Sequence, residues 1–151
     1  MVTIETQLNQ EITSLLHEEI TYNEFMNDSM LIISAIKSGI PYSLFNLIQD
    51  YSPFTENDWA KFLDISTKSL HRYKMEHAFS FKRIHSEKII EMAEVTKIGL
   101  DVFGDMEKLK GWLNTPNYAL GKMKPIELIT DSYGKELVIA EMTRIDQGIF
   151  V

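Results

Sequence analysis

Apolar residues recur along most of this chain at intervals of three and four positions, which is the spacing of an amphipathic helix. The first example is a polar arm, residues 1–19, in which Leu8, Ile12, Leu15 and Leu16 share one helical face. This apolar stripe needs a partner surface, which either the core of the same chain or a second copy supplies. No stretch alternates apolar and polar residues for long enough to form a sheet, so the pattern predicts an all-α fold.

Glycine, proline and capping residues divide the remaining chain into short helices. Gly39 and Pro41 separate two of them, Ser86 is expected to cap a long helix, and Asp105 is expected to cap the next. Gly134 is expected to open the last helix. The predicted helices cover residues 28–37, 42–50, 56–63, 67–74, 87–103, 106–113, 125–129 and 134–147.

Four apolar residues recur at helical spacing in the last of these helices, namely Leu137, Val138, Met142 and Ile145. Gly148 follows where a left-handed residue would end the helix. The pattern therefore predicts a small helical unit at the C-terminus with a short apolar tail behind it. We place the domain boundary so that residues 1–95 form one region and residues 96–151 the other.

The string WAKFLDISTKSLHRY, which begins at Trp59, resembles a DNA-binding helix-turn-helix. It has a small residue at Ala60, an apolar residue in the turn at Ile65 and an inward position at Leu70. The first helix is expected to start after Thr55, and Ser66 is expected to cap the second helix. The candidate DNA-binding residues are Ser66, Thr67, Lys68, Ser69, His71, Arg72 and Lys74.

Charge supports this interpretation locally, although the whole chain has a net charge of -7. Residues 59–90 contain seven basic and three acidic residues, a balance of +4, and the remainder then carries -11. A basic block in an acidic chain is typical of a DNA-binding module joined to another function. The alternative is a solvated helix on an all-α domain.

The last forty residues carry the most specific pattern. It consists of Trp112-Leu113, Pro116-Asn117, Ala119-Leu120-Gly121, Pro125, Glu127-Leu128, Gly134, Val138, Arg144-Ile145 and Gly148. In this order and spacing, the segment resembles the C-terminal toxin-binding domain of Xre/MbcA/ParS-type antitoxins. Two positions depart from the family pattern: Lys122 stands where a second glycine is common, and Lys124 where a threonine usually precedes the proline.

The resemblance implies a cytoplasmic antitoxin of a type II toxin–antitoxin pair. In such a protein a helical N-terminal region forms a homodimer, binds operator DNA and represses its own operon. The C-terminal domain binds a cognate toxin, usually a RES-domain protein that depletes NAD, and blocks its active-site entrance. The residues that the resemblance assigns to toxin binding are Arg144, Asp146, Gly148, Ile149, Phe150 and Val151. Without the resemblance, the apolar tail would be expected to pack on its own domain.

Chemistry of other kinds is absent from the sequence. There are no cysteines, and the zincin-like start His17-Glu18-Glu19 has Thr21 where the second histidine should stand. No catalytic residues, metal site or cofactor are therefore predicted, and neither are a signal peptide and a membrane span. Two other functions stay open. One is a stand-alone DNA-binding regulator, and the other is a toxin-binding protein that does not contact DNA.

Overall fold

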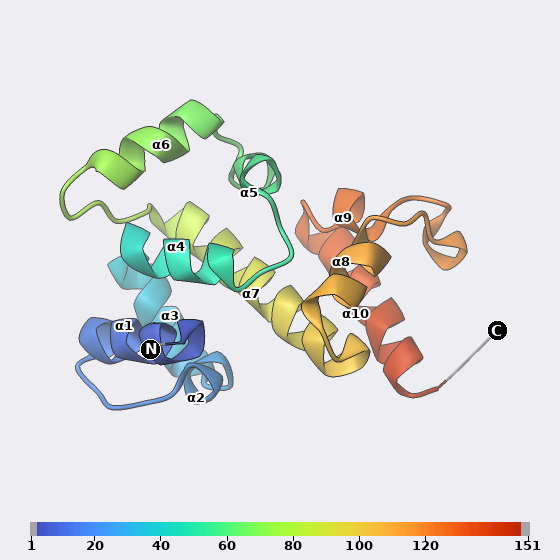
Figure 1. Cartoon of the computed structure of the whole chain (residues 1–151), viewed down its shortest axis with the longest axis horizontal. Helices are drawn as coiled ribbons and strands as arrows, with labels where there is room; N and C mark the ends of the chain where they lie inside the picture. Colours follow the sequence, from blue (N-terminus) through green and yellow to red (C-terminus); the bar gives the residue numbers. More distant parts are fainter. Residues whose placement is uncertain (1–2, 149–151) are drawn as a thin grey trace. The chain divides into compact units, whose positions relative to one another are not determined.

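The computed structural model describes residues 3–148, and within this range every regular element is helical (Figure 1). The elements in chain order are α1 (Ile4–Leu16), α2 (Tyr22–Met26), α3 (Ser29–Ser38), α4 (Tyr42–Asp50), α5 (Glu56–Leu63), α6 (Thr67–Met75), α7 (Arg83–Phe103), α8 (Met106–Leu113), the 3-10 helix η1 (Tyr118–Leu120), α9 (Pro125–Leu128) and α10 (Ser132–Asp146). The predicted all-α fold is confirmed. The chain divides into two compact units, residues 1–93 and 94–151, which are described separately.

In the N-terminal unit, the amphipathic arm packs within its own chain. Helix α1 contacts α4, α2 and α3, and its side chains Leu8 and Ile12 are fully buried. The side-chain carbonyl of Asn9 accepts a hydrogen bond from the backbone N–H of Tyr22, which ties α1 to the start of α2. The core of this unit is therefore the partner surface of the stripe on α1.

An aromatic cluster joins α4, α5 and the segment before α7. Trp59 is fully buried, and its ring makes edge contacts with Phe45, Phe54 and Phe62 at centroid distances of 5.2, 5.7 and 5.8 Å. Phe45 also meets Phe81 at 5.0 Å. Edge-to-face pairs of this kind stabilise a fold by roughly 0.5–1.5 kcal/mol each beyond the area that they bury. The cluster thus fixes α5 on the body of the N-terminal unit.

Ser86 does not cap a helix, contrary to the expectation from sequence. Helix α7 begins at Arg83, so Ser86 lies in its first turn, where it is fully buried. Its hydroxyl accepts a hydrogen bond from the Ile40 N–H at 2.9 Å and donates one to the Phe81 carbonyl at 3.3 Å. A serine hydroxyl can cap a helix or bridge two buried backbone groups. Here the hydroxyl binds the Ile40 N–H and the Phe81 carbonyl, so it bridges two buried backbone groups.

The C-terminal unit is held by close contacts at two glycines. A Cβ on Gly99 of α7 would come within 2.3 Å of a Leu109 methyl group on α8. A Cβ on Gly134 of α10 would come within 1.9 Å of the Leu128 carbonyl oxygen on α9. At Gly134 the obstructing atom belongs to the backbone, so only glycine permits the approach and this residue sets how near α9 and α10 lie; at Gly99 the obstructing atoms belong to the Leu109 side chain.

Helix α10 begins at Ser132, two residues before the start expected at Gly134. The N-cap is Asp131, whose carboxylate accepts a hydrogen bond from the Gly134 N–H at 2.6 Å. The apolar residues at helical spacing do not all face the core, because the side chain of Leu137 is 48% exposed while Val138 and Met142 are fully buried. The contact between Gly134 and α9 sets the rotation of α10, and it turns Leu137 outward.

Candidate functional site

A tight turn connects α5 to α6. Helix α5 starts with a capping box in which the Thr55 hydroxyl and the Asp58 carboxylate each bind the other's backbone N–H. It ends at Asp64, which has a left-handed backbone with φ 53°. The Ile65 N–H reaches back to the Ala60 carbonyl at 3.0 Å, so the turn has Schellman geometry with aspartate in place of the usual glycine.

Helix α6 carries six of the seven candidate DNA-binding residues, and the seventh, Ser66, is its N-cap. Leu70 is 1% exposed and faces the core, whereas the four cationic or titratable candidates are exposed; they are Lys68, His71, Arg72 and Lys74. Thr67 and Ser69 are half-buried, and the Ser66 hydroxyl accepts from the Ser69 N–H at 3.0 Å as the predicted N-cap. The structure thus brings the predicted residues onto one helix, with cations on its exposed side.

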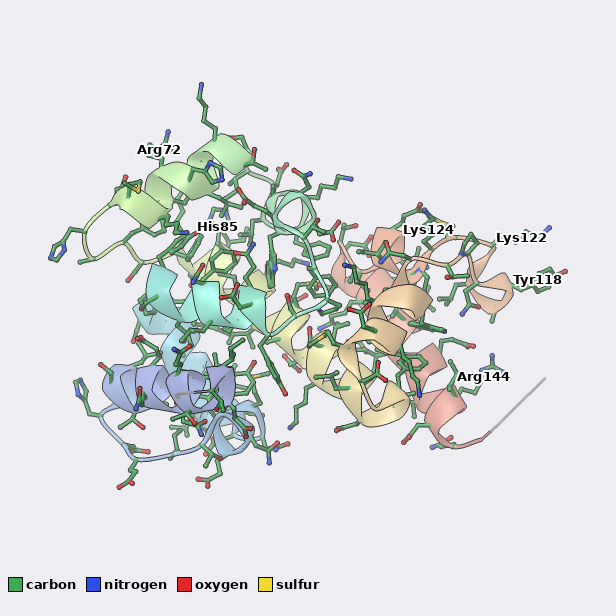
Figure 2. The ribbon with its side chains drawn as sticks, in the orientation of Figure 1. Arg72, His85, Tyr118, Lys122, Lys124 and Arg144 are labelled. Carbon is green, nitrogen blue, oxygen red and sulfur yellow. The ribbon has the colours of Figure 1, made fainter. Side chains whose placement is uncertain are left out.

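One of these side chains, that of Arg72, lies against an aromatic stack at the end of α6. The Arg72 guanidinium lies 5.4 Å from the centroid of the Tyr73 ring, and Tyr73 stacks on Phe79 with centroids 4.1 Å apart. In the view of Figure 2, Arg72 and His85 lie on opposite sides of α6. The stack supports the C-terminal end of α6, and it gives Arg72 a surface to lie against.

An acidic residue lies beside the exposed face of α6. His71 Nε2 is 2.5 Å from Glu56 Oε1 at the start of α5, and both side chains are substantially exposed. Glu56 Oε1 has no hydrogen-bond partner, and the contact with His71 is an ion pair only when the imidazole is protonated. Glu56 therefore adds negative charge next to a helix whose other exposed side chains are mostly cationic.

The candidate toxin-binding residues begin at the end of α10. Arg144 is clamped by Glu141, whose carboxylate receives Nε at 3.0 Å and Nη2 at 2.6 Å. These hydrogen bonds raise the pKa of Arg144 further above its ordinary value, so the guanidinium stays charged. Asp146 is exposed, and Gly148 has the predicted left-handed backbone with φ 69°. Ile149, Phe150 and Val151 lie outside the described residues.

One exposed feature of the C-terminal unit was missed in the sequence. The ammonium of Lys122 lies 5.5 Å from the centroid of the Tyr118 ring, and Tyr118 is 84% exposed (Figure 2). Lys122 has a left-handed backbone with φ 66°, directly after Gly121 with φ 69°. The sequence did offer one signal for this turn, namely Lys122 at a position where glycine is common. Glycine is common there because the backbone is left-handed.

Four of the other family-pattern residues are buried in the C-terminal unit, namely Leu113, Pro125, Gly134 and Val138. Trp112 is half-buried with its ring 5.3 Å from that of Phe103. Pro125 occupies the first turn of α9, where its missing N–H costs no hydrogen bond. These residues shape the unit and leave the exposed side of α10 to other side chains.

Within residues 3–148, no helix combines the length and the apolar character needed to span a bilayer. In the same range, no three histidine, aspartate or glutamate side chains gather as ligands for one metal ion.

Comparison with known proteins finds a family similar to the C-terminal unit. Residues 99–148 match the family model described as the antitoxin Xre/MbcA/ParS C-terminal toxin-binding domain. The fold is also similar to one chain of the crystal structure of the M. tuberculosis MbcT–MbcA toxin–antitoxin complex. That match has a TM-score of 0.56 and 21% sequence identity, and it covers 71% of this chain and 94% of that chain. No curated protein matches this sequence.

The matched residues run from Gly99 near the end of α7 to Gly148 after α10. They include both close-packed glycines, the loop with Tyr118 and Lys122, and the clamped Arg144. The resemblance expected from the sequence is therefore confirmed, and the C-terminal third of this chain is similar to the Xre/MbcA/ParS C-terminal toxin-binding domain.

Proposed function

We propose that this chain is the antitoxin of a type II toxin–antitoxin pair, and that its C-terminal unit binds and neutralises a cognate toxin. The observation that carries the proposal is the match of residues 99–148 to a toxin-binding domain model. The fold similarity to a chain of a toxin–antitoxin complex agrees with it. The proposed toxin is a RES-domain protein that depletes NAD, and the proposed compartment is the cytoplasm.

The mechanism of neutralisation is steric. Helix α10 is anchored by the buried Val138 and Met142, so it presents its end in a fixed direction. Arg144, Asp146, Gly148 and the tail, residues 149–151, would then reach the entrance of the toxin's active site. A preordered helix loses little conformational freedom on binding, which favours affinity.

The N-terminal unit is proposed to bind operator DNA as a homodimer and to repress the operon. Support comes from the basic balance of residues 59–90 and from the exposed cations of α6. In a helix-turn-helix, the start of the second helix contacts base edges while lysine and arginine contact phosphates. Ser66, Thr67, Lys68 and Ser69 lie at that start. His71, Arg72 and Lys74 lie further along α6.

Co-expression with the protein encoded beside this chain tests the toxin-binding proposal. We expect the neighbour to arrest growth when expressed alone, to co-purify with this chain and to be harmless in the complex. Deleting residues 149–151 is expected to weaken neutralisation and to leave DNA binding unchanged. Full neutralisation by the truncated chain would refute the role of the tail.

A binding assay with DNA from the chain's own promoter tests the second activity. We expect Lys68→Ala and Arg72→Ala each to weaken binding by about 1–3 kcal/mol, because each removes a direct contact to base or phosphate. Lys37→Ala is the matched control, since it removes an exposed lysine from α3 rather than α6. Equal affinity of all four proteins would instead favour a toxin-binding protein without DNA contact.

A Glu56→Gln variant gives a second test in the same DNA-binding assay. The Glu56 carboxylate lies against His71 and adds negative charge beside α6. If α6 docks on DNA, Glu56→Gln removes repulsion from the phosphates and tightens binding. If the DNA affinity of Glu56→Gln equals that of the wild type, α6 does not approach the phosphates closely.

A further inference from the structure

The outer face of α10 carries large exposed side chains that its own unit leaves uncovered. Tyr133 is 81% exposed and Leu137 is 48% exposed, although both lie in the helix whose other side forms the core of the C-terminal unit. Single exposed apolar residues are common on protein surfaces. An adjacent pair on one helix, in a unit that matches a toxin-binding model, points to a partner.

The helical period places these residues on one line with Arg144. At 3.6 residues per turn, positions 133, 137, 140 and 144 fall within a narrow sector of the helix. The buried Gly134, Val138 and Met142 fall on a different sector. Three exposed residues, Tyr133, Leu137 and Ala140, and the half-buried Arg144 therefore form a continuous stripe, which leads along α10 to Gly148. We name it the α10 stripe.

Arg144, at the C-terminal end of the α10 stripe, is held in place by hydrogen bonds. Glu141 engages Nε and Nη2 of its guanidinium, which fixes the side chain in one position. Arginine and tyrosine are enriched among the residues that contribute most to binding between proteins. A fixed arginine also loses less conformational entropy when it binds. The α10 stripe thus has an aromatic residue at one end and an ordered cation at the other.

Charge around the α10 stripe favours a protein partner over nucleic acid or an anionic membrane. Glu136 is exposed on the same helix and lies 3.8 Å from the Lys135 ammonium, Glu141 is paired with Arg144, and Asp146 follows Arg144 by two residues. Because Glu141 already engages Arg144, the one cation of the stripe is neutralised and attracts phosphates little. A protein surface with an apolar groove and mixed charge fits this pattern.

The surface area that the α10 stripe can bury favours the toxin over a second copy of this chain as its partner. Tyr133 and Leu137 together offer on the order of 300 Å², whereas a stable interface needs roughly 800 Å² from each partner. Two copies pairing only through the α10 stripe would fall short of that area. A toxin that also contacts the exposed Asp146 and Gly148 at the end of α10 gains additional surface there.

We infer that the α10 stripe is part of the toxin-binding surface, with Tyr133 and Leu137 as anchors that extend the contact beyond the C-terminal tail. This inference rests on the proposed function, because the occupant is the toxin named there. It adds to that function a second point of attachment, which lies on a rigid helix. Toxin binding then requires both ends of α10.

The test compares two double variants of the full chain in binding to the purified neighbouring-gene protein, which is inactivated so that it can be produced alone. Tyr133→Ala with Leu137→Ala removes the anchors and is expected to weaken binding at least tenfold, as loss of two anchor side chains does. Ser132→Ala with Thr143→Ala is the matched control. It changes two exposed residues of α10 outside the stripe, and it is expected to bind within threefold of the wild type.

Each outcome has a defined meaning. Thermal unfolding shows whether both double variants fold like the wild type, as expected for exposed positions. If the wild type binds the neighbour and the Tyr133/Leu137 variant binds equally well, the inference is wrong while the proposed function stands. If the wild type itself does not bind, the proposed function fails. If the variant keeps toxin binding but alters the oligomeric state of the free chain by light scattering, a second copy occupies the stripe and the inference is overturned.

Discussion

Gly134 of α10 lies so close to Leu128 of α9 that a Cβ on the glycine would be 1.9 Å from the leucine carbonyl oxygen. The obstructing atom belongs to the backbone, so a side-chain rotation cannot relieve the clash. We therefore predict that Gly134→Ala destabilises the C-terminal unit by about 3 kcal/mol or more, beyond the usual cost of overpacking. Urea unfolding followed by circular dichroism measures this loss.

Gly111→Ala is the matched control for that substitution. Gly111 is exposed in α8, and a Cβ there would meet no atom within 4 Å. Alanine has the higher helix propensity, so this variant should be more stable by about 0.5–1 kcal/mol. Two glycine-to-alanine changes in one unit are thus predicted to have opposite signs. A Gly134→Ala variant as stable as the wild type would contradict the α9–α10 contact.

The turn between α5 and α6 gives a second prediction. Asp64 has a left-handed backbone, which costs free energy for any residue with a Cβ. We predict that Asp64→Gly raises the free energy of unfolding by about 0.5–1 kcal/mol. Asp64→Asn removes the same charge and keeps the Cβ, so it serves as the control. If the free energy of unfolding rises equally in both variants, the loss of the charge explains the increase and the backbone conformation does not.

The buried hydroxyl of Ser86 gives a third prediction. Ser86→Ala would leave the Ile40 N–H without its 2.9 Å acceptor in a buried setting. An unsatisfied buried donor costs about 1–3 kcal/mol, so we predict a loss of stability in that range. Ser34→Ala in α3 replaces an exposed serine and should change stability little. Equal effects of the two changes would argue that the Ser86 hydroxyl does not bridge Ile40 and Phe81.

The fourth prediction concerns pH. Burial lowers the pKa of the His85 imidazole, nearby Lys82 lowers it further, and Asp64 opposes both. The unfolded chain therefore binds a proton at a higher pH than the folded protein does. It follows that stability is retained above the ordinary histidine pKa of about 6.5 and is lost as the pH falls below that value.

His85→Gln isolates this effect, because glutamine has no charge to gain. Between pH 7.5 and pH 5.5, we expect the wild type to lose more stability than the variant, measured as the shift in urea midpoint. His17→Gln in the same assay controls for the loss of a histidine elsewhere in the N-terminal unit. Identical shifts for the wild type and His85→Gln would show that His85 charges as readily in the folded protein as in the unfolded chain.

Local signals predicted much of this fold. Thr55, Ser66 and Asp105 cap helices as expected, because a capping residue acts on backbone groups two or three positions away. The same signal failed at Ser86, whose partner Ile40 lies 46 residues away along the chain. The short α2 was not predicted. Its five residues are too few to show a period.

The candidate toxin-binding surface shows where the sequence pattern stops being informative. Helical spacing placed Leu137 with Val138 and Met142, since four apolar residues on a helix do not fix which of them face inward. The contact between Gly134 and Leu128 sets the rotation of α10, and it can be seen only in the folded unit. The family pattern located the C-terminal unit correctly, whereas the exposed Tyr133 and Tyr118 lie outside that pattern.

Direct measurement of binding between this chain and the protein encoded beside it tests the central claim most directly. Isothermal titration of the full chain into the inactivated neighbour, together with a growth assay of the active neighbour, gives both affinity and neutralisation. The antitoxin proposal predicts a tight complex, and it predicts growth arrest that this chain relieves. A neighbour that is harmless by itself and shows no heat of binding would contradict the proposal.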